Sequence, residues 1–344
     1  MTLFIHEFKL KLMEKEKRIA VIGSGSWATA IVKILSNNSD SIHWYFRNQA
    51  DIDFVKKYKH NPKYLSSVSF DLNKLSISSH LEETIAQADI VILSVPSAFI
   101  NDTLKDLPKT IFENKLVFSA IKGIVPEYNL IVGEYLNTIY NVPLENIGVI
   151  TGPCHAEEVA LEKLSYLTIA SRNITHAEIL CEAMRCRYIK CSSSDDIYGT
   201  EISAVLKNVV AVAGGICHSL GYGDNFLSVL VSNAIQEIDR FVAAVHPIER
   251  DTKASAYLGD LIVTAYSQFS RNRMFGAMLG KGYSVKNAQL EMNMIAEGYY
   301  AVKCVCELNK KYNVHIPITN AVNNIIYNNK NAKAEMELLA DMLS

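Results

Sequence analysis

Lys207 is the residue of this chain whose sequence surroundings most clearly favour chemistry. It lies in a segment from Ile202 to Ile216 whose aliphatic residues recur at steps of three and four, as on one face of a helix. A lysine buried in such a helix has a lowered pKa, so its neutral amine can act as a general base near neutral pH. Removal of a hydride from a secondary alcohol requires a base of this kind on the hydroxyl. The alternative is a lysine that extends its amine along an apolar surface into solvent.

Two further polar segments follow Lys207 in the sequence. Gly259-Asp260-Leu261 carries a carboxylate, and Ser270-Arg271-Asn272 directly precedes a predicted helix. A substrate phosphate is held by a guanidinium group, neutral donors and free backbone N–H groups, and the second segment offers all three. The alternative is an ordinary helix N-cap followed by a surface arginine.

A glycine-rich turn near the start of the chain indicates a phosphate-bearing cofactor. The apolar run 18–22 is followed at once by Gly23-Ser24-Gly25-Ser26-Trp27-Ala28. This G-x-G-x-x-A pattern between a strand and a helix is typical of dinucleotide-binding turns, because Gly23 permits the tight turn and Gly25 lets a pyrophosphate approach the backbone. The start of the following helix offers free N–H groups to the phosphates. A glycine-rich turn without a ligand is the alternative.

The residues after the second predicted strand bear on the choice of cofactor. The acidic residue that usually holds the ribose of NAD, about 20 positions after the turn, is missing. Arg47 stands there instead and can meet a 2′-phosphate or stack on adenine. This favours acceptance of NADP, although Asp51 and Asp53 are still candidates for the ribose. Arg47 as a solvated surface cation is the alternative.

Hydrophobic patterning predicts two different halves. The predicted strands are 18–22, 42–46, 89–95, 115–120, 147–150 and 166–170, with helical runs between them. This alternation favours right-handed crossovers and a parallel or mixed sheet, whereas only helical patterns follow Gly199. We expect an α/β fold with a Rossmann-type doubly wound sheet and then an all-α C-terminal domain. The expected divisions are an N-terminal extension at 1–16, a dinucleotide-binding domain at 17–197 and a helical substrate-binding domain at 198–344.

Composition and charge exclude several classes of protein. Apolar residues make up 49% of the chain and charged residues 20%, and the net charge is −2, which favours a folded core and disfavours a nucleic-acid binder. No apolar run approaches the ~18 residues of a membrane-spanning helix, and residues 1–17 lack the apolar stretch of a signal peptide. The seven cysteines, an odd number in a long chain, predict free thiols in a reducing cytoplasm and no metal site.

The ordered set of motifs resembles the NAD(P)-dependent glycerol-3-phosphate dehydrogenases of bacterial type. The likeness runs from about residue 17 to about residue 330. The matching segments are Gly23-Ser24-Gly25-Ser26-Trp27, Val95-Pro96-Ser97, Lys122-Gly123, Gly152-Pro153, Leu206-Lys207-Asn208-Val209, Gly221-Tyr222-Gly223-Asp224-Asn225, Gly259-Asp260-Leu261, Ser270-Arg271-Asn272-Arg273-Met274-Phe275-Gly276, Ala296-Glu297-Gly298 and Pro317-Ile318-Thr319.

This resemblance implies a role for each matching position. Lys207 is implied to be the general base, and Lys122 a second active-site lysine that polarises the substrate oxygen. The implied substrate-binding residues are Lys122, Gly152, Cys154, Lys207, Asp260, Ser270, Arg271 and Asn272. The implied cofactor-binding residues are Gly23, Gly25, Ser26, Trp27, Arg47, Lys122, Ala156, Arg271, Ile295 and Glu297.

The chain departs from the family pattern at four places. Ala28 replaces a common glycine, and Cys154 stands where a serine is usual, so a hydroxyl contact is lost there. Ser203-Ala204-Val205 replaces a Gly-Gly-Ala type stretch, and the approach to Gly259 is shortened. All the charged groups are present.

The function that the resemblance implies is interconversion of sn-glycerol 3-phosphate and dihydroxyacetone phosphate with NAD or NADP. Reduction would supply glycerophospholipid synthesis in the cytoplasm. The expected partner is a small phosphate substrate, with a homodimer as a possible assembly and no nucleic acid, metal or membrane span. One rival is another two-domain dehydrogenase acting on a hydroxy acid or an acyl thioester. A second rival is a dinucleotide-sensing protein that needs no base at Lys207.

Overall fold

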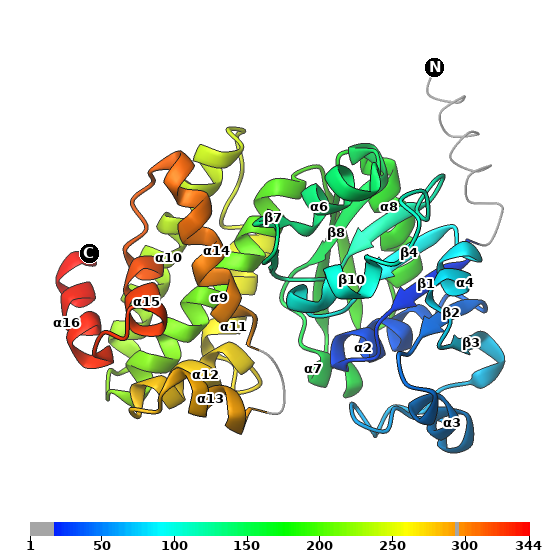
Figure 1. Ribbon diagram of the computed structural model, residues 1–344, viewed down its shortest axis with the longest axis horizontal. Helices are drawn as coiled ribbons and strands as arrows, with labels where there is room; N and C mark the ends of the chain where they lie inside the picture. The colour runs from blue at the N-terminus through cyan, green and yellow to red at the C-terminus, as the bar shows by residue number, and fades with distance from the viewer. Residues whose placement is uncertain (1–16, 293–295) are drawn as a thin grey trace.

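The structure, a computed structural model, describes residues 17–292 and 296–344. A sheet-containing half and a helical half lie side by side, and the C-terminal helix is at the outer end of the helical half (Figure 1). The expected extension at 1–16 and the expected cofactor residue Ile295 lie outside the described residues.

One eight-stranded sheet forms the first half. Its order is β10-β9-β8-β5-β4-β1-β2-β3, and every neighbouring pair is parallel except β8 and β9, which are antiparallel. The order reverses direction between β1 and β4, as in doubly wound folds that bind ligands at that point. The strands are β1 (Ile19–Ile22), β2 (Ile42–Tyr45), β3 (Leu75–Ser78), β4 (Ile90–Leu93), β5 (Leu116–Ser119), β8 (Ile147–Thr151), β9 (Ser165–Ser171) and β10 (Ile189–Ser194).

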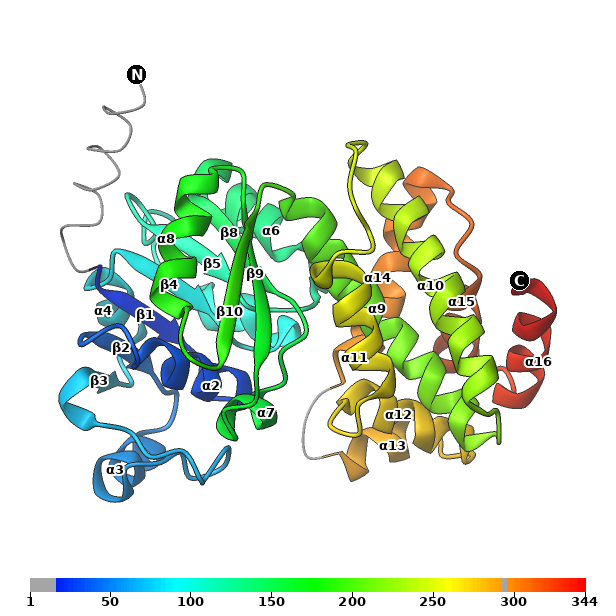
Figure 2. The same cartoon turned by 180° about the vertical axis from the view of Figure 1, so that it is seen from behind.

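Helices cover both faces of this sheet, which explains why its central strands are apolar without alternation. In β1, Ile19 and Val21 face one apolar cluster, whereas Ala20 and Ile22 face another. Figure 2 shows α8 lying against β9 and β10. The helices of this half are α2 (Ser26–Leu35), α3 (Gln49–Tyr58), α4 (Leu81–Ala86), α5 (Ile100–Leu104), α6 (Val132–Tyr140), α7 (Ala156–Ala160) and α8 (Ile174–Met184), with short 3₁₀ turns at Leu72–Lys74, Ser97–Phe99 and Leu144–Asn146.

The helical half is built around α9, which is buried along nearly its whole length. Its closest neighbour is α12, because Gly215 and Gly276 let the two backbones meet: a Cβ at Gly276 would lie 2.0 Å from the carbonyl oxygen of Val212. The helices are α9 (Ile197–Ser219), α10 (Asp224–Val245), α11 (Asp260–Tyr266), α12 (Arg271–Gly280), α13 (Val285–Glu291), α14 (Glu297–Tyr312), α15 (Pro317–Tyr327) and α16 (Ala332–Met342), and a π-turn at Ser255–Gly259 precedes α11.

The expected fold class is confirmed, and the two halves are also tied together by a small hairpin. All six predicted strands are present, and no strand follows Ser194 among the described residues. In the hairpin of β6 (Ile124–Val125) and β7 (Leu130–Ile131), Ile124 and Ile131 join the core of the helical half, whereas Val125 joins the sheet half.

The proposed boundary between 17–197 and 198–344 falls in the first turn of α9. Ile197 still packs on Val149 and Ala170 of the sheet, and the side chains that follow it enter the helical core. Among the described residues, α9 is the one helix long and apolar enough to cross a membrane by length and composition. Because 89% of its most apolar window is buried inside the structure, it has the character of a core helix.

Candidate active site

The turn after β1 is held in a conformation that requires glycine. Gly23 has a φ of +126°, and a Cβ there would lie 2.3 Å from the carbonyl oxygen of Ser94 at the end of β4. Trp44 Nε1 donates to the Gly23 carbonyl at 2.8 Å, and Asn61 Nδ2 donates to the Ser24 carbonyl at 3.0 Å. The turn is therefore fixed at the carboxyl ends of β1 and β4, where the strand order reverses.

The start of α2 has free donors. Its N-cap, Gly25, makes no side-chain capping bond, and the first turn holds no acidic residue. A Cβ at Gly25 would meet nothing within 4 Å, so open space lies above the backbone. This end of α2 opens on a cleft of about 1330 Å³ between the two halves. The buried Trp27 Nε1 also lacks a partner among the described residues. A pyrophosphate fits such a cradle.

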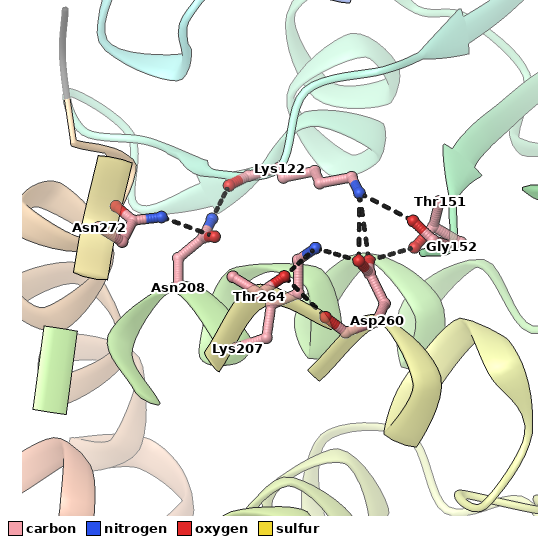
Figure 3. A network of polar contacts seen from close by, with 8 residues as sticks. All are labelled: Lys122, Thr151, Gly152, Lys207, Asn208, Asp260, Thr264 and Asn272. Atoms are coloured by element: carbon pink, nitrogen blue, oxygen red, sulfur yellow. Dashed lines mark hydrogen bonds and ion pairs between the residues drawn. The ribbon is translucent and has the colours of Figure 1, made fainter. Parts of the chain in front are cut away.

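Lys207 projects from the middle of α9 to the opposite wall of this cleft. Its side chain is 5% exposed, and its Nζ pairs with Asp260 Oδ1 and donates to Thr264 Oγ1 at 3.0 Å (Figure 3). Burial lowers the pKa of Lys207 to about 7; Lys122 lowers it too, whereas Asp260 raises it. The predicted buried lysine is therefore present, and the surface alternative is wrong.

Asp260 joins the two lysines from opposite halves. Lys122 Nζ, from the segment after β5, lies 3.1 Å from Asp260 Oδ2 and donates to the Gly152 carbonyl at 3.2 Å. Burial alone would raise the pKa of Asp260, but Lys122 and Lys207 outweigh it and hold that pKa below its ordinary value. Asp260 is therefore an ionised carboxylate between two amines (Figure 3).

A chain of amides continues from this cluster. Asn208 Nδ2 donates to the Lys122 carbonyl at 2.7 Å, and Asn272 Nδ2 donates to Asn208 Oδ1 at 2.8 Å. Asn272 Oδ1 in turn accepts from Gly298 N at 2.9 Å, at the start of α14. These bonds fix the side chains of α9 and α12 against the sheet half.

Ser270, Arg271 and Asn272 all line the cleft at the start of α12. Ser270 is also the N-cap, and its Oγ accepts from Arg273 N at 3.3 Å. The two interpretations of this segment are thus compatible: a capped helix start carries an arginine that faces the cleft. Cys154 lines the same cleft, and burial raises the pKa of its thiol to about 12, so it is neutral.

A second link between the halves lies at Glu297. This carboxylate, the first residue of α14, accepts from Ser97 N at 2.9 Å and pairs with Ser97 Oγ. Burial raises the pKa of Glu297, and the bonds from Ser97 lower it. Ala156, the first residue of α7, lines the cleft nearby.

Arg47 lines the outer end of the cleft beside Asn48 and Gln49. The two acidic candidates there already have partners: Lys63 Nζ lies 2.7 Å from Asp51 Oδ2, and Gln49 Nε2 donates to Asp53 Oδ1 at 2.8 Å. Arg47 thus stands at the wall of the cleft and forms no ion pair with a carboxylate of the described residues.

Most residues expected from the sequence come together in this one cleft, with Gly152 as the exception among those described. Gly152 contributes its carbonyl to Lys122 and does not line the cleft wall. The expected residues that do line it are Gly23, Gly25, Ser26, Trp27, Arg47, Lys122, Cys154, Ala156, Lys207, Asp260, Ser270, Arg271, Asn272 and Glu297.

Several residues of the site carried no assigned role in the sequence. Thr264 stands one helical turn after Asp260, and that i, i+4 spacing was a usable signal. Asn208 directly follows Lys207, and Ser97 ends the Val95-Pro96-Ser97 segment. Thr151 Oγ1, 3.4 Å from Asp260 Oδ2, had no such signal. Within 17–292 and 296–344, no group of three or more His, Cys, Asp or Glu residues is placed to hold a metal ion.

Comparison with known proteins finds one family along the chain. The profile described as NAD-dependent glycerol-3-phosphate dehydrogenase N-terminus matches residues 18–177. The profile described as the C-terminus of the same family matches residues 196–337.

Individual relatives extend this likeness over nearly the full length. A glycerol-3-phosphate dehydrogenase [NAD(P)+] of Agathobacter rectalis is 33% identical over 322 residues, which cover 92% of this chain and 93% of the relative. One of Oceanobacillus iheyensis is 32% identical over 94% of this chain and 93% of its own. The crystal structure of glycerol-3-phosphate dehydrogenase from Coxiella burnetii is 26% identical, with a TM-score of 0.87 over 94% of this chain and 98% of that one.

Proposed function

Because the chain belongs to the NAD-dependent glycerol-3-phosphate dehydrogenase family, we propose that it interconverts sn-glycerol 3-phosphate and dihydroxyacetone phosphate with NAD or NADP. The observation that carries the proposal is the buried amine of Lys207, on the wall of the cleft into which the free start of α2 also opens. A proton acceptor and a dinucleotide cradle thus share one enclosure between the halves.

The residues at the start of α2 fit a dinucleotide. Gly23 and Gly25 let the pyrophosphate approach, and the N–H groups of Ser26 and Trp27 face it. Ala156, Arg271 and Glu297 are proposed to line the rest of the cofactor path, with Lys122 near its reactive end. When bound, the nicotinamide accepts or supplies the hydride.

Ser270, Arg271 and Asn272 are proposed to hold the substrate phosphate. The Arg271 guanidinium supplies charge-assisted bonds, and the N–H groups at the start of α12 add to them. Lys122, Asp260, Lys207 and Cys154 then surround the three-carbon body. The neutral thiol of Cys154 contributes volume here rather than charge.

Lys207 is proposed to move the proton. In oxidation its neutral amine accepts the proton of the C2 hydroxyl; in reduction its ammonium returns that proton to the carbonyl oxygen. Lys122 stabilises negative charge that develops on the same oxygen. Asp260 orients both amines, and its buried negative charge offsets their positive charge.

The reaction test is a substrate panel with the purified chain. Dihydroxyacetone phosphate, a 2-keto acid and a 3-ketoacyl thioester are each supplied with NADPH and with NADH, and absorbance is followed. We expect turnover of the phosphate substrate alone, and we expect Arg271→Lys to raise its KM because a point charge cannot replace a bidentate fork. Turnover of a phosphate-free substrate and none of dihydroxyacetone phosphate would favour the rival dehydrogenase.

Cofactor choice is proposed to depend on Arg47. A guanidinium at the end of β2 favours a 2′-phosphate, so Arg47→Asp should lower kcat/KM with NADPH more than with NADH. An equal loss of kcat/KM with NADPH and with NADH would show that Arg47 does not determine the choice of cofactor.

The cellular setting is also a proposal. Free thiols at all seven cysteines suit a cytoplasmic enzyme that supplies glycerol 3-phosphate to glycerophospholipid synthesis. The homodimer stays a prediction, which the molar mass in solution would test.

A further inference from the structure

Three cysteines lie at the edge of the sheet half, away from the active-site cleft. Cys181 is on α8, Cys191 is on β10, and Cys186 lies in the turn between them, five residues from each. Figure 2 shows α8 lying alongside β10, and the two elements are in contact. None of these cysteines lines the cleft.

Two of these thiols are in direct contact. Cys191 Sγ donates to Cys181 Sγ at 2.9 Å, and both residues are reduced. A disulfide places its sulfurs about 2.05 Å apart, so closure requires a movement of only about 1 Å. The turn at 185–188 is the segment that has to accommodate this movement.

The surroundings favour a negative charge on Cys181, whereas contact with Cys181 and burial raise the pKa of Cys191 and keep that residue a thiol. Cys181 accepts from Cys191, and Arg185, whose guanidinium also donates to the Cys191 carbonyl at 3.1 Å, lies close to both. The bond from Cys191 is the largest cause of a lowered pKa at Cys181, and Arg185 lowers it further. Cys181 is 2% exposed, whereas Cys191 is half-buried and reaches the surface.

We propose that Cys181 and Cys191 are a redox-active dithiol, which a hydroperoxide converts to an intramolecular disulfide between α8 and β10. Cys181, as the thiolate, attacks one oxygen of the peroxide; an S–O bond forms, the O–O bond breaks and hydroxide leaves. The Cys191 thiol then attacks the sulfenic sulfur and gives up its proton, the S–S bond forms and water leaves. Each sulfur loses one electron, and the two peroxide oxygens gain both.

The other cysteines provide internal contrasts. Cys154, in the active-site cleft, has a thiol whose pKa burial raises to about 12, and no cysteine beside it to form a disulfide among the described residues. Cys304 and Cys306 stand two apart on α14, and Cys217 contacts Met336 Sδ at 3.4 Å in the helical core. None of these four is bonded to another cysteine in the part of the chain that the structure describes.

Peroxide treatment of the full chain tests the proposal. The protein is exposed to hydrogen peroxide, the peroxide is removed with catalase, and thiols are counted after unfolding and alkylation. We expect the count to fall from seven to five, with a peptide map that joins Cys181 to Cys191. A count that stays at seven, or a disulfide that joins other cysteines, would overturn the proposal.

Two matched variants complete the test. Cys186→Ser lacks the thiol of the turn, and peroxide treatment should still lower its thiol count by two. Cys191→Ser, at a half-buried position, removes the partner sulfur and should form no disulfide at Cys181; a loss of two thiols in this variant would contradict the assigned pair. The wild-type peptide map decides the question even where a variant folds poorly, and dithiothreitol should restore the full count.

Discussion

At the scale of the residue, the site depends on a carboxylate shared by two amines. Asp260 is 1% exposed and contacts Lys207 from its own half and Lys122 from the other. An isolated buried charge is costly, and pairing with the two amines offsets that cost. The same carboxylate opposes the effect of burial on Lys207, so it sets the pH at which the amine becomes a base.

The pH dependence of turnover should therefore respond to Asp260. Oxidation needs neutral Lys207, so its kcat should rise as the pH passes about 7, whereas kcat for reduction should fall over the same range. Asp260→Asn removes the carboxylate that raises the pKa of Lys207. The pH range over which kcat for oxidation rises should therefore move to lower pH, and kcat itself should fall ~10²-fold.

The measurement is the pH profile of kcat in both directions. Asp89→Asn, which removes an exposed partner of Arg18 away from the cleft, is the control and should leave the profile unchanged. If the rise of kcat for oxidation moves to higher pH in Asp260→Asn, the carboxylate does not stabilise the charged form of Lys207.

Sequence patterning reaches some of these residues and misses others. The spacing of the apolar residues around Lys207 predicts its burial, because burial follows helical periodicity. The pairing of Lys207 with Asp260 joins positions far apart in the sequence, and only the family resemblance indicated that both belong to the site. Thr151 approaches Asp260 from a third segment, and its type and spacing carry no signal.

At the scale of the element, the turn from β1 into α2 separates two roles of glycine. Gly23 adopts a positive φ with the Ser94 carbonyl close by, so glycine is needed for the fold. Gly25 has ordinary extended geometry, with a φ of −73° and a ψ of −178°, and open space in front of it, so glycine is needed there for a ligand.

Alanine at each position should produce a different defect. Gly23→Ala should lower the free energy of unfolding by ~2 kcal/mol or more, because both backbone strain and a collision oppose it. Gly25→Ala should change that free energy by less than ~0.5 kcal/mol and still raise the Kd for NADPH at least ~10-fold. Denaturant unfolding and cofactor titration of the two variants make the comparison.

The two alanine variants are expected to lose different properties, stability at position 23 and cofactor binding at position 25. If Gly25→Ala binds NADPH as the wild type does, the start of α2 is not the pyrophosphate site. If Gly23→Ala unfolds at the same denaturant concentration as the wild type, the close approach to Ser94 is not a constraint on the fold.

Within the eight-stranded sheet, the strands that sequence patterning misses are those at its two edges. β3 is a four-residue strand that is nowhere fully buried, and β10 ends in three serines. Neither has the continuous apolar run that identifies the central strands, because each pairs on only one side and packs less. Their place in the sheet comes from register with β2 and β9, which local sequence does not encode.

At the scale of the whole molecule, polar contacts across the cleft fix one half against the other. Ser97 and Glu297 form one of them, and they join the end of β4 to the start of α14. Glu297 is half-buried at the cleft, so loss of a donor to it leaves a partly desolvated carboxylate with a missing partner. The patterning of each half predicts its own fold, whereas this contact depends on how the halves dock.

Ser97→Ala should destabilise the chain in a pH-dependent way. The bond from Ser97 Oγ lowers the pKa of Glu297, so its loss raises that pKa in the folded state, while the bond from the backbone N–H of residue 97 remains. Stability is then lost as the pH rises and Glu297 must ionise, and the loss should be ~1–3 kcal/mol at pH 8 and smaller at pH 5.

Unfolding by denaturant at both pH values measures this difference. Ser228→Ala, at an exposed serine that bonds only within α10 and to Tyr266, is the control and should have little effect at either pH. A destabilisation by Ser97→Ala that is larger at pH 5 would contradict the ionised contact.

The central claim is that an amine from the helical half moves the proton for a reaction on a cofactor held by the sheet half. The most direct measurement is turnover of dihydroxyacetone phosphate with NADPH by Lys207→Met, beside the Kd of the same variant for NADPH. The account predicts a loss of kcat of ~10²–10⁴-fold with NADPH binding retained. Near-normal turnover in a variant that binds NADPH normally would contradict it.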